Sequence, residues 1–159
     1  MNKKKLNNNK GFTLVELIVV LVILAILAAI LVPALLGYID RAKGQQIVLN
    51  ARSAYTAAQA EMTSMYAKST EPTDALLNYS TGTNGKRLWS TADVSDCTAL
   101  KIGCKAAYAT TVTHDMYTVV YVEYTEKGET VYLVNGEWLS LTSDGAQSAP
   151  TGVKVYTVK

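Results

Sequence analysis

Hydrophobic residues are distributed unevenly along this chain, and the longest apolar run lies near its start. Residues 17–39 are 23 consecutive uncharged, mostly apolar positions. An α-helix needs about 20 such residues to cross a bilayer, so this run is long enough to span a membrane. Residues 1–11 contain four lysines and no acid. This basic leader predicts that the N-terminus stays in the cytoplasm and that residues 12–39 form the membrane-spanning segment.

Beyond the apolar run, apolar residues recur at every third or fourth position. The stripe consists of Ile47, Ala51, Tyr55, Ala58, Met62, Met65 and Tyr66. This spacing is typical of an amphipathic α-helix that buries one face. We expect it to continue the membrane helix, giving one long helix over residues 12–68. Pro72 then prevents further extension, because the residue before a proline disfavours helical geometry.

The last third of the chain has a β-strand pattern. β-forming residues on both alternating faces predict a strand from 116 to 124, and further strands are expected over 130–134 and 137–141. Asn135-Gly136 is a strong hairpin signal, since both residues tolerate positive φ. A fourth strand is expected over 153–158, after a loop rich in Ser, Gly and Pro.

The middle of the chain carries a weaker signal. Turn residues lie at 82–85, and a short helix is expected over 91–101, ended by Gly103. Together the elements predict an α+β fold, in which a small antiparallel sheet over about 117–158 packs on the apolar stripe of the long helix. Residues 69–159 would form one globular head outside the cytoplasm.

The junction between leader and apolar run has a distinctive order. A secretory signal peptide has its small-residue cleavage site after a short apolar region, whereas Gly11 precedes the apolar run here. The sequence Gly11-Phe12-Thr13-Leu14-Val15-Glu16, with the apolar helix and Pro33 behind it, resembles the N-terminus of type IV pilins, the family with class III signal peptides. This resemblance implies that a prepilin peptidase cleaves between Gly11 and Phe12, removes residues 1–11 and methylates the new amine of Phe12.

Glu16 stands at the edge of the apolar run, where a carboxylate is costly and usually functional. In one interpretation Thr13 is an N-cap and Glu16 reaches back to form a capping box, with Phe12 and Leu17 as a hydrophobic staple. In the other, Glu16 pairs with the charged amine of Phe12 on a neighbouring subunit. The two can coexist, since an acid also suits the positive end of a helix. The family resemblance favours the pairing.

Pro33 lies inside the apolar run. A proline removes one intrahelical hydrogen bond and clashes with the preceding turn, so a kink or local break is expected. Neighbouring helices can tolerate an ordinary proline kink within a membrane. By the pilin resemblance, residues 25–33 are the stretch expected to unwind in an assembled fibre.

The chain has two cysteines, Cys97 and Cys104, both in the part placed outside the cytoplasm. We expect a disulfide between them, with two buried thiols as the alternative. A metal site that uses both cysteines and His114 lacks a fourth ligand at sensible spacing, so we predict no metal and no cofactor.

Nothing in the sequence predicts an enzyme. The single histidine, His114, has no accompanying nucleophile, and no paired carboxylates are evident. Removing the four leader lysines changes the formal net charge from +2 to −2. The mature chain therefore lacks the excess positive charge that is typical of nucleic-acid-binding proteins. Lys86 and Arg87 beside Trp89 are the one place where contact with DNA would be sought, although a solvated loop explains them better.

These features favour a structural protein: the major pilin of a type IV pilus, serving attachment, motility or a related role. The alternatives are a minor pilin or pseudopilin of a secretion or DNA-uptake system, and an adhesin anchored by an uncleaved helix. The resemblance implies other copies of the chain, the prepilin peptidase, an assembly ATPase and a membrane platform as partners. The precursor would lie in the cytoplasmic membrane and the assembled filament on the cell surface.

Overall fold

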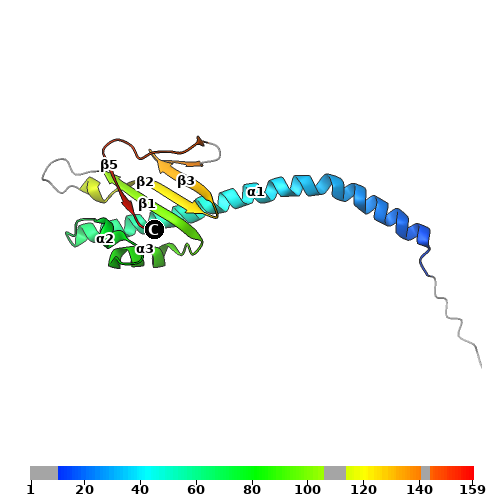
Figure 1. Cartoon of the computed structure of the whole chain (residues 1–159), viewed down its shortest axis with the longest axis horizontal. Helices are drawn as coiled ribbons and strands as arrows, with labels where there is room; N and C mark the ends of the chain where they lie inside the picture. Colours follow the sequence, from blue (N-terminus) through cyan, green and yellow to red (C-terminus); the bar gives the residue numbers. More distant parts are fainter. Residues whose placement is uncertain (1–10, 106–113, 141–143) are drawn as a thin grey trace, which may run out of the picture. The chain divides into compact units, whose positions relative to one another are not determined.

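The computed structural model describes residues 11–105, 114–140 and 144–159 (Figure 1). In these ranges the fold is α+β, with a long N-terminal helix and a small antiparallel sheet, as predicted. Helix α1 runs over Leu14–Ala67, so its end agrees with the predicted end at 68 to within one residue. The chain divides into two compact units, one up to Lys43 and one from Gly44 to Lys159.

In the first unit, α1 is exposed on all sides. Every residue from 11 to 43 is exposed, and no part of the apolar window is buried. The helix continues through Pro33, so of the expected kink or local break, the break is not present. Its ribbon instead curves along this segment (Figure 1). A proline can be accommodated in this way when the turn before it opens slightly.

In the second unit, the amphipathic half of α1 supplies one side of the core. Five predicted stripe residues are buried: Ile47, Ala51, Ala58, Met62 and Met65. Tyr55 is half-buried, whereas Tyr66 is 46% exposed and does not belong to the buried face. After Ala67 the chain turns through Ser69, which has a φ of 52°.

Two short helices follow, α2 over Asp74–Leu77 and α3 over Thr83–Ala92. The helix predicted over 91–101 is therefore wrong. Asp93 adopts a left-handed conformation with φ of 51° and ends α3, and strand β1 occupies Cys97–Lys105. Gly103, predicted to stop a helix, lies within this strand. The local sequence suits either state, and pairing with distant strands decides between them.

The sheet has five strands in the order β4-β3-β2-β1-β5, all pairs antiparallel. The strands other than β1 are β2 (Val119–Glu126), β3 (Glu129–Val134), β4 (Glu137–Ser140) and β5 (Val153–Thr157). A 3₁₀ turn, η1 (His114–Tyr117), precedes β2, so the predicted strand begins later than 116. The Asn135-Gly136 hairpin is confirmed, with φ of 53° and 86°.

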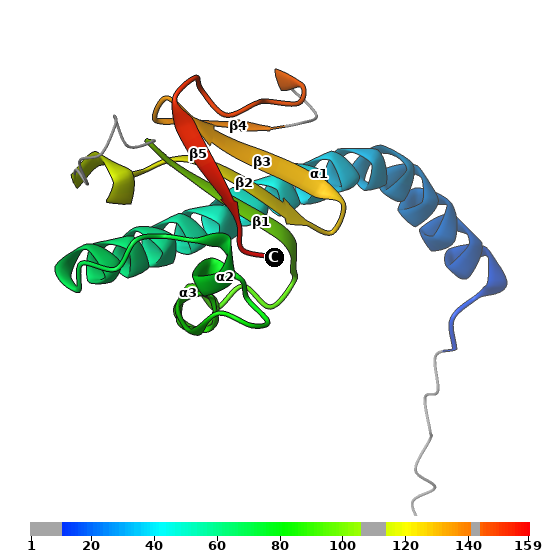
Figure 2. The same cartoon turned by 60° about the vertical axis from the view of Figure 1, so that its left-hand side comes forward.

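The strand that was missed, β1, is an internal strand of the sheet, between β2 and the edge strand β5. It pairs with both β2 and β5, and so fixes the position of the last strand. One face of the sheet packs on the second half of α1, and α2 and α3 lie beside the same part of that helix (Figure 2). The sheet thus begins at residue 97 rather than 117.

Candidate site at the N-terminal junction

The N-terminal junction is the strongest functional candidate. Residues 11–13 are not helical, and α1 begins at Leu14 with Thr13 as its N-cap. The Thr13 hydroxyl accepts a hydrogen bond from the backbone N–H of Glu16 at 3.2 Å. In return, the backbone N–H and the hydroxyl of Thr13 both donate to Glu16 Oε2, at 2.8 and 2.7 Å. The predicted capping box is confirmed.

The capping box leaves part of the Glu16 carboxylate available. Both bonds from Thr13 end on Oε2, and no described residue donates to Oε1. The hydrophobic staple is not formed, because Phe12 is 83% exposed and Leu17 is also mostly exposed. The junction therefore presents a non-helical segment, an exposed aromatic side chain and a carboxylate oxygen that can accept from a further donor.

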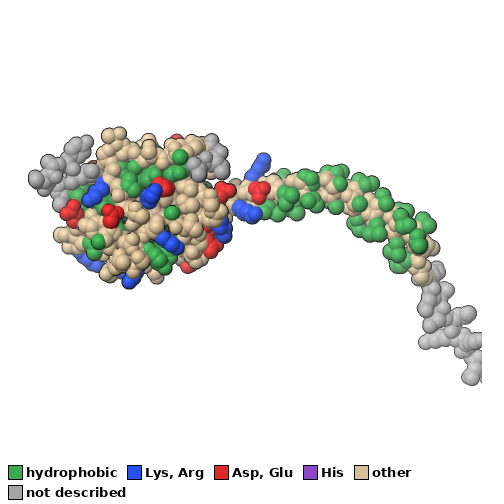
Figure 3. Space-filling view, viewed as in Figure 1, with side chains coloured by type: hydrophobic (Ala, Val, Ile, Leu, Met, Phe, Trp, Pro, Cys, Tyr) green, Lys and Arg blue, Asp and Glu red, His purple; other side chains and the backbone are tan. Residues whose placement is uncertain are grey.

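The helix that follows is a candidate membrane span, long and apolar enough to cross a bilayer. Apolar side chains cover this segment of α1 (green in Figure 3). Such a surface is not stable in water, so lipid or other apolar helices must cover it.

Residues 6–32 match the family model for the prokaryotic N-terminal methylation motif. This motif is the class III signal peptide of type IV prepilins, and it supports a pilin-like or pseudopilin-like substrate of prepilin peptidase that inserts into the membrane. No curated protein and no solved structure matches the chain.

The two cysteines are free and buried. The expected disulfide is not formed, because both residues belong to β1, at positions 97 and 104. Seven residue-to-residue steps along the strand separate them by about 23 Å, whereas a disulfide needs Cα atoms within about 7 Å. Burial raises the pKa of the Cys97 thiol to about 11 and that of Cys104 to about 12. Both behave as core residues.

The residues considered for metal binding are not brought together. In the described ranges, no group of three or more His, Cys, Asp or Glu side chains could hold a metal ion. His114 lies in η1, exposed, with its ring at 5.5 Å from that of Tyr66 in an edge contact. It is a surface residue before β2.

Arg87, one of the basic pair beside Trp89, has a structural role that the sequence did not reveal. Arg87 Nη2 donates to both carboxylate oxygens of Glu61, at 2.9 and 2.8 Å. Asn84 donates to the same carboxylate, which is only 5% exposed. Trp89 packs against Tyr79, and the Lys159 ammonium lies 4.2 Å from its ring centroid. These contacts join α3 to α1 and to the chain after β5.

A second buried carboxylate, Glu126, was also missed. It is 2% exposed and accepts hydrogen bonds from Asn50 and from the Tyr124 hydroxyl, both at 2.8 Å. Lys127 Nζ lies 3.4 Å from its other oxygen. A buried acid of this kind is tolerated because its oxygens are satisfied. The signal that could have found it is its place in the buried-residue alternation of β2.

Proposed function

We propose that this protein is the repeating subunit, the major pilin, of a type IV pilus. The observation that carries the proposal is the methylation motif at residues 6–32 joined directly to a helix that is exposed along its whole apolar length. In a fibre, apolar helices of many copies would cover one another. The protein would act by assembly rather than by catalysis.

Processing at the junction fits this role. Cleavage between Gly11 and Phe12 requires an accessible, non-helical segment, and residues 11–13 have both properties. The new α-amine of Phe12 would be methylated and would remain positively charged. The cut would remove the basic leader in the cytoplasm and leave the apolar helix on the mature chain.

The Glu16 carboxylate would set the position of one subunit against the next. Its Oε2 atom belongs to the capping box, while Oε1 is free to accept from the Phe12 amine of a neighbouring copy. Among apolar helices such a pair would be desolvated, so a subunit docked out of register would leave one charge uncompensated. The capping box and the pairing therefore operate together.

Pro33 would matter in the fibre rather than in the isolated chain. Its ring nitrogen cannot donate to the preceding turn, so residues 25–33 have one helical hydrogen bond fewer than an uninterrupted helix. We propose that this segment unwinds when subunits pack and allows the fibre to extend.

The proposed partners are other copies of the chain, the prepilin peptidase, an assembly ATPase and its membrane platform. The precursor would lie in the cytoplasmic membrane with its leader in the cytoplasm, and the filament would extend from the cell surface. Attachment, motility or a related role would follow. A minor pilin or pseudopilin would share the same N-terminal junction, and an anchored adhesin would keep residues 1–11.

An intact mass with N-terminal fragmentation, measured on material sheared from the cell surface, tests the proposal. We expect an abundant chain that begins at methylated Phe12. A processed chain that is scarce in sheared fibres would identify a minor pilin or pseudopilin instead. A chain that begins at Met1 and is confined to membranes would contradict the pilin assignment altogether.

A further inference from the structure

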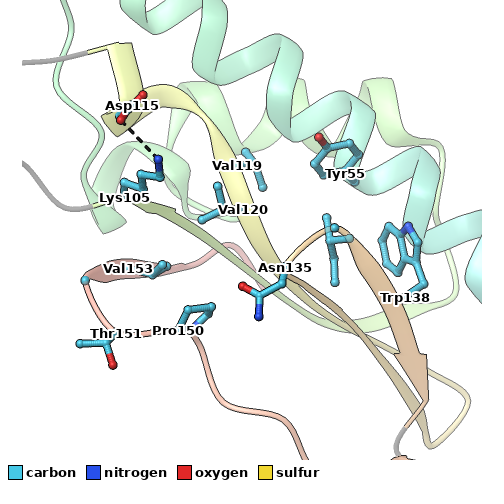
Figure 4. Close-up of a pocket in the computed structure, with 13 residues that line it drawn as sticks. Tyr55, Lys105, Asp115, Val119, Val120, Asn135, Trp138, Pro150, Thr151 and Val153 are labelled. Carbon is cyan, nitrogen blue, oxygen red and sulfur yellow. Dashed lines mark hydrogen bonds and ion pairs between the residues drawn. The ribbon is translucent and has the colours of Figure 1, made fainter.

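A groove of about 630 Å³ opens at one end of the sheet in the head (Figure 4). It lies where β1 ends and β5 begins, and where the β3–β4 hairpin turns. Helix α1 contributes Tyr55 to its wall. This volume is in the range of pockets that hold small molecules.

The walls of the groove present apolar side chains that the fold covers only in part. The half-buried members of the lining are Tyr55, Val120, Trp138, Pro150 and Val153. The rings of Tyr55 and Trp138 meet edge to face, with centroids 6.4 Å apart and an angle of 86°. A concave surface with two half-buried aromatic rings suits a ligand that has a flat apolar face.

Two polar side chains on the groove have no partner in the described part of the chain. Asn135 and Thr151 are exposed, and no hydrogen bond to either side chain is found among the described residues. Asn135 is held with positive φ in the hairpin turn, and Val153 N–H donates to the Pro150 carbonyl at 3.2 Å. The two turns that carry Asn135 and Thr151 are therefore already formed before a ligand binds.

The described residues that line the groove carry no net charge. Its charged lining residues are Lys105 and Asp115, whose side chains form an ion pair at 3.4 Å (dashed in Figure 4). A phosphate or another anion would find no unpaired cation among these residues, and a metal ion would find a single carboxylate. The lining thus favours a neutral ligand that carries hydrogen-bonding groups.

We propose that this groove binds a neutral saccharide. A sugar ring has an apolar C–H face that can stack on Trp138 or Tyr55. Its hydroxyls both donate and accept, which matches the amide of Asn135 and the hydroxyl of Thr151. A purely apolar ligand would bury these polar groups without partners. A proline-rich peptide would also fit aromatic walls, but its prolines have no N–H to offer the acceptors.

The test is a titration of the full chain in a sugar-free detergent, lauryldimethylamine oxide, because a maltoside would compete. The probes are triacetylchitotriose, maltotriose and lactose. Binding of each is monitored by tryptophan fluorescence. We expect a saturable change with at least one of them. Trp89→Phe is the matched control, since Trp89 lies on α3 outside the groove lining, and it should keep both affinity and signal.

Two variants then test the site itself by calorimetry with the sugar that binds best. Trp138→Leu removes the ring and keeps an apolar residue, and Asn135→Gly removes the amide while suiting the turn. Each should weaken binding at least tenfold, with far-UV circular dichroism and melting temperature confirming the fold. The proposal is overturned if none of the three sugars binds, if both variants bind as well as the parent chain, or if only an oligoproline peptide binds.

Discussion

Gly103 on β1 lies directly opposite Tyr121 on β2, and Tyr121 takes the space that a side chain at position 103 would need. A Cβ atom at Gly103 would lie 2.9 Å from Tyr121 Cβ and 2.6 Å from Val153 Cγ1. Tyr121 is buried as a result, and its hydroxyl donates to Glu123 Oε2 at 3.1 Å. The packing of Gly103, Tyr121 and Val153 therefore joins strands β1, β2 and β5 on the face of the sheet away from α1.

Gly103→Ala should therefore destabilise the head. The added methyl must displace Tyr121 and Val153, and overpacking of this kind costs about 1–3 kcal/mol. Urea unfolding followed by near-UV circular dichroism measures the effect. Gly44→Ala is the control, because nothing lies within 4 Å of a Cβ there and alanine favours a helix. Equal stability of both variants would show that the sheet accommodates the methyl group.

The second prediction concerns the ion pair between Glu61 and Arg87, which should stabilise the head. Arg87→Ala leaves a buried carboxylate with Asn84 but no cation. Since the Arg87 side chain is 46% exposed, we expect a loss of about 1.5–3 kcal/mol, below the value for a fully buried pair. Lys86→Ala, next to it and exposed, should have little effect.

A double variant separates charge burial from lost packing. Glu61→Gln combined with Arg87→Ala removes both charges and keeps an acceptor for Asn84. We expect it to recover most of the stability lost in Arg87→Ala alone. A double variant that is no more stable than Arg87→Ala would mean that packing of the arginine side chain, rather than its charge, joins α3 to α1.

The head should lose stability at alkaline pH. Burial raises the pKa of Cys97 from 9.0 to about 11, that of Cys104 from 9.0 to about 12, and that of Tyr156 from 10.0 to about 12. The folded state holds these protons after the unfolded chain has released them. Stability should be full below pH 9 and fall above it, by about 1.4 kcal/mol per pH unit for each group between its two values.

Unfolding free energies between pH 7 and 11 check this slope. In Cys104→Ala the contribution of one thiol disappears, so the fall above pH 9 should become less steep even though the cavity lowers stability at every pH. An unchanged slope in that variant would indicate that the thiol ionises equally in the folded and unfolded states.

The sequence predicted those elements whose signal is local. The apolar stripe predicted α1, and the β-forming alternation predicted β2 and β3. Asn135-Gly136 predicted the hairpin that leads to β4. Strand β1 was missed because its lysines, alanine and glycine carry little intrinsic strand preference, and its state depends on pairing with residues about 20 and 50 positions away.

The polar contacts of the head were missed for a related reason. Glu61 and Glu126 look like solvated residues in the sequence, and only the fold brings Arg87 and Asn50 to them. The disulfide was predicted from proximity along the chain, but an extended strand separates the two cysteines in space. At the N-terminal junction the donor and acceptor are three residues apart, so the capping box could be predicted in full.

That junction also allows the two roles of Glu16 to be separated. Thr13→Ala breaks the capping box but keeps the charge, whereas Glu16→Gln keeps the box and removes the charge. Loss of an N-cap costs about 0.5–2 kcal/mol of helix stability. Burial of α1 in the membrane should keep the helix formed despite this loss. Loss of a buried charge pair between subunits costs about 3–5 kcal/mol at each contact.

We therefore expect Thr13→Ala to assemble filaments at near-normal yield and Glu16→Gln to lower the yield by at least a hundredfold. Both should insert into the membrane normally. The measurements are the quantity of sheared filament per cell, membrane fractionation, and the mass of the mature chain, which must show cleavage at Phe12 in both variants. Normal filaments from Glu16→Gln would leave the capping box as the sole role of this carboxylate. A strong defect confined to Thr13→Ala would mean that the helix start, rather than the charge, controls assembly.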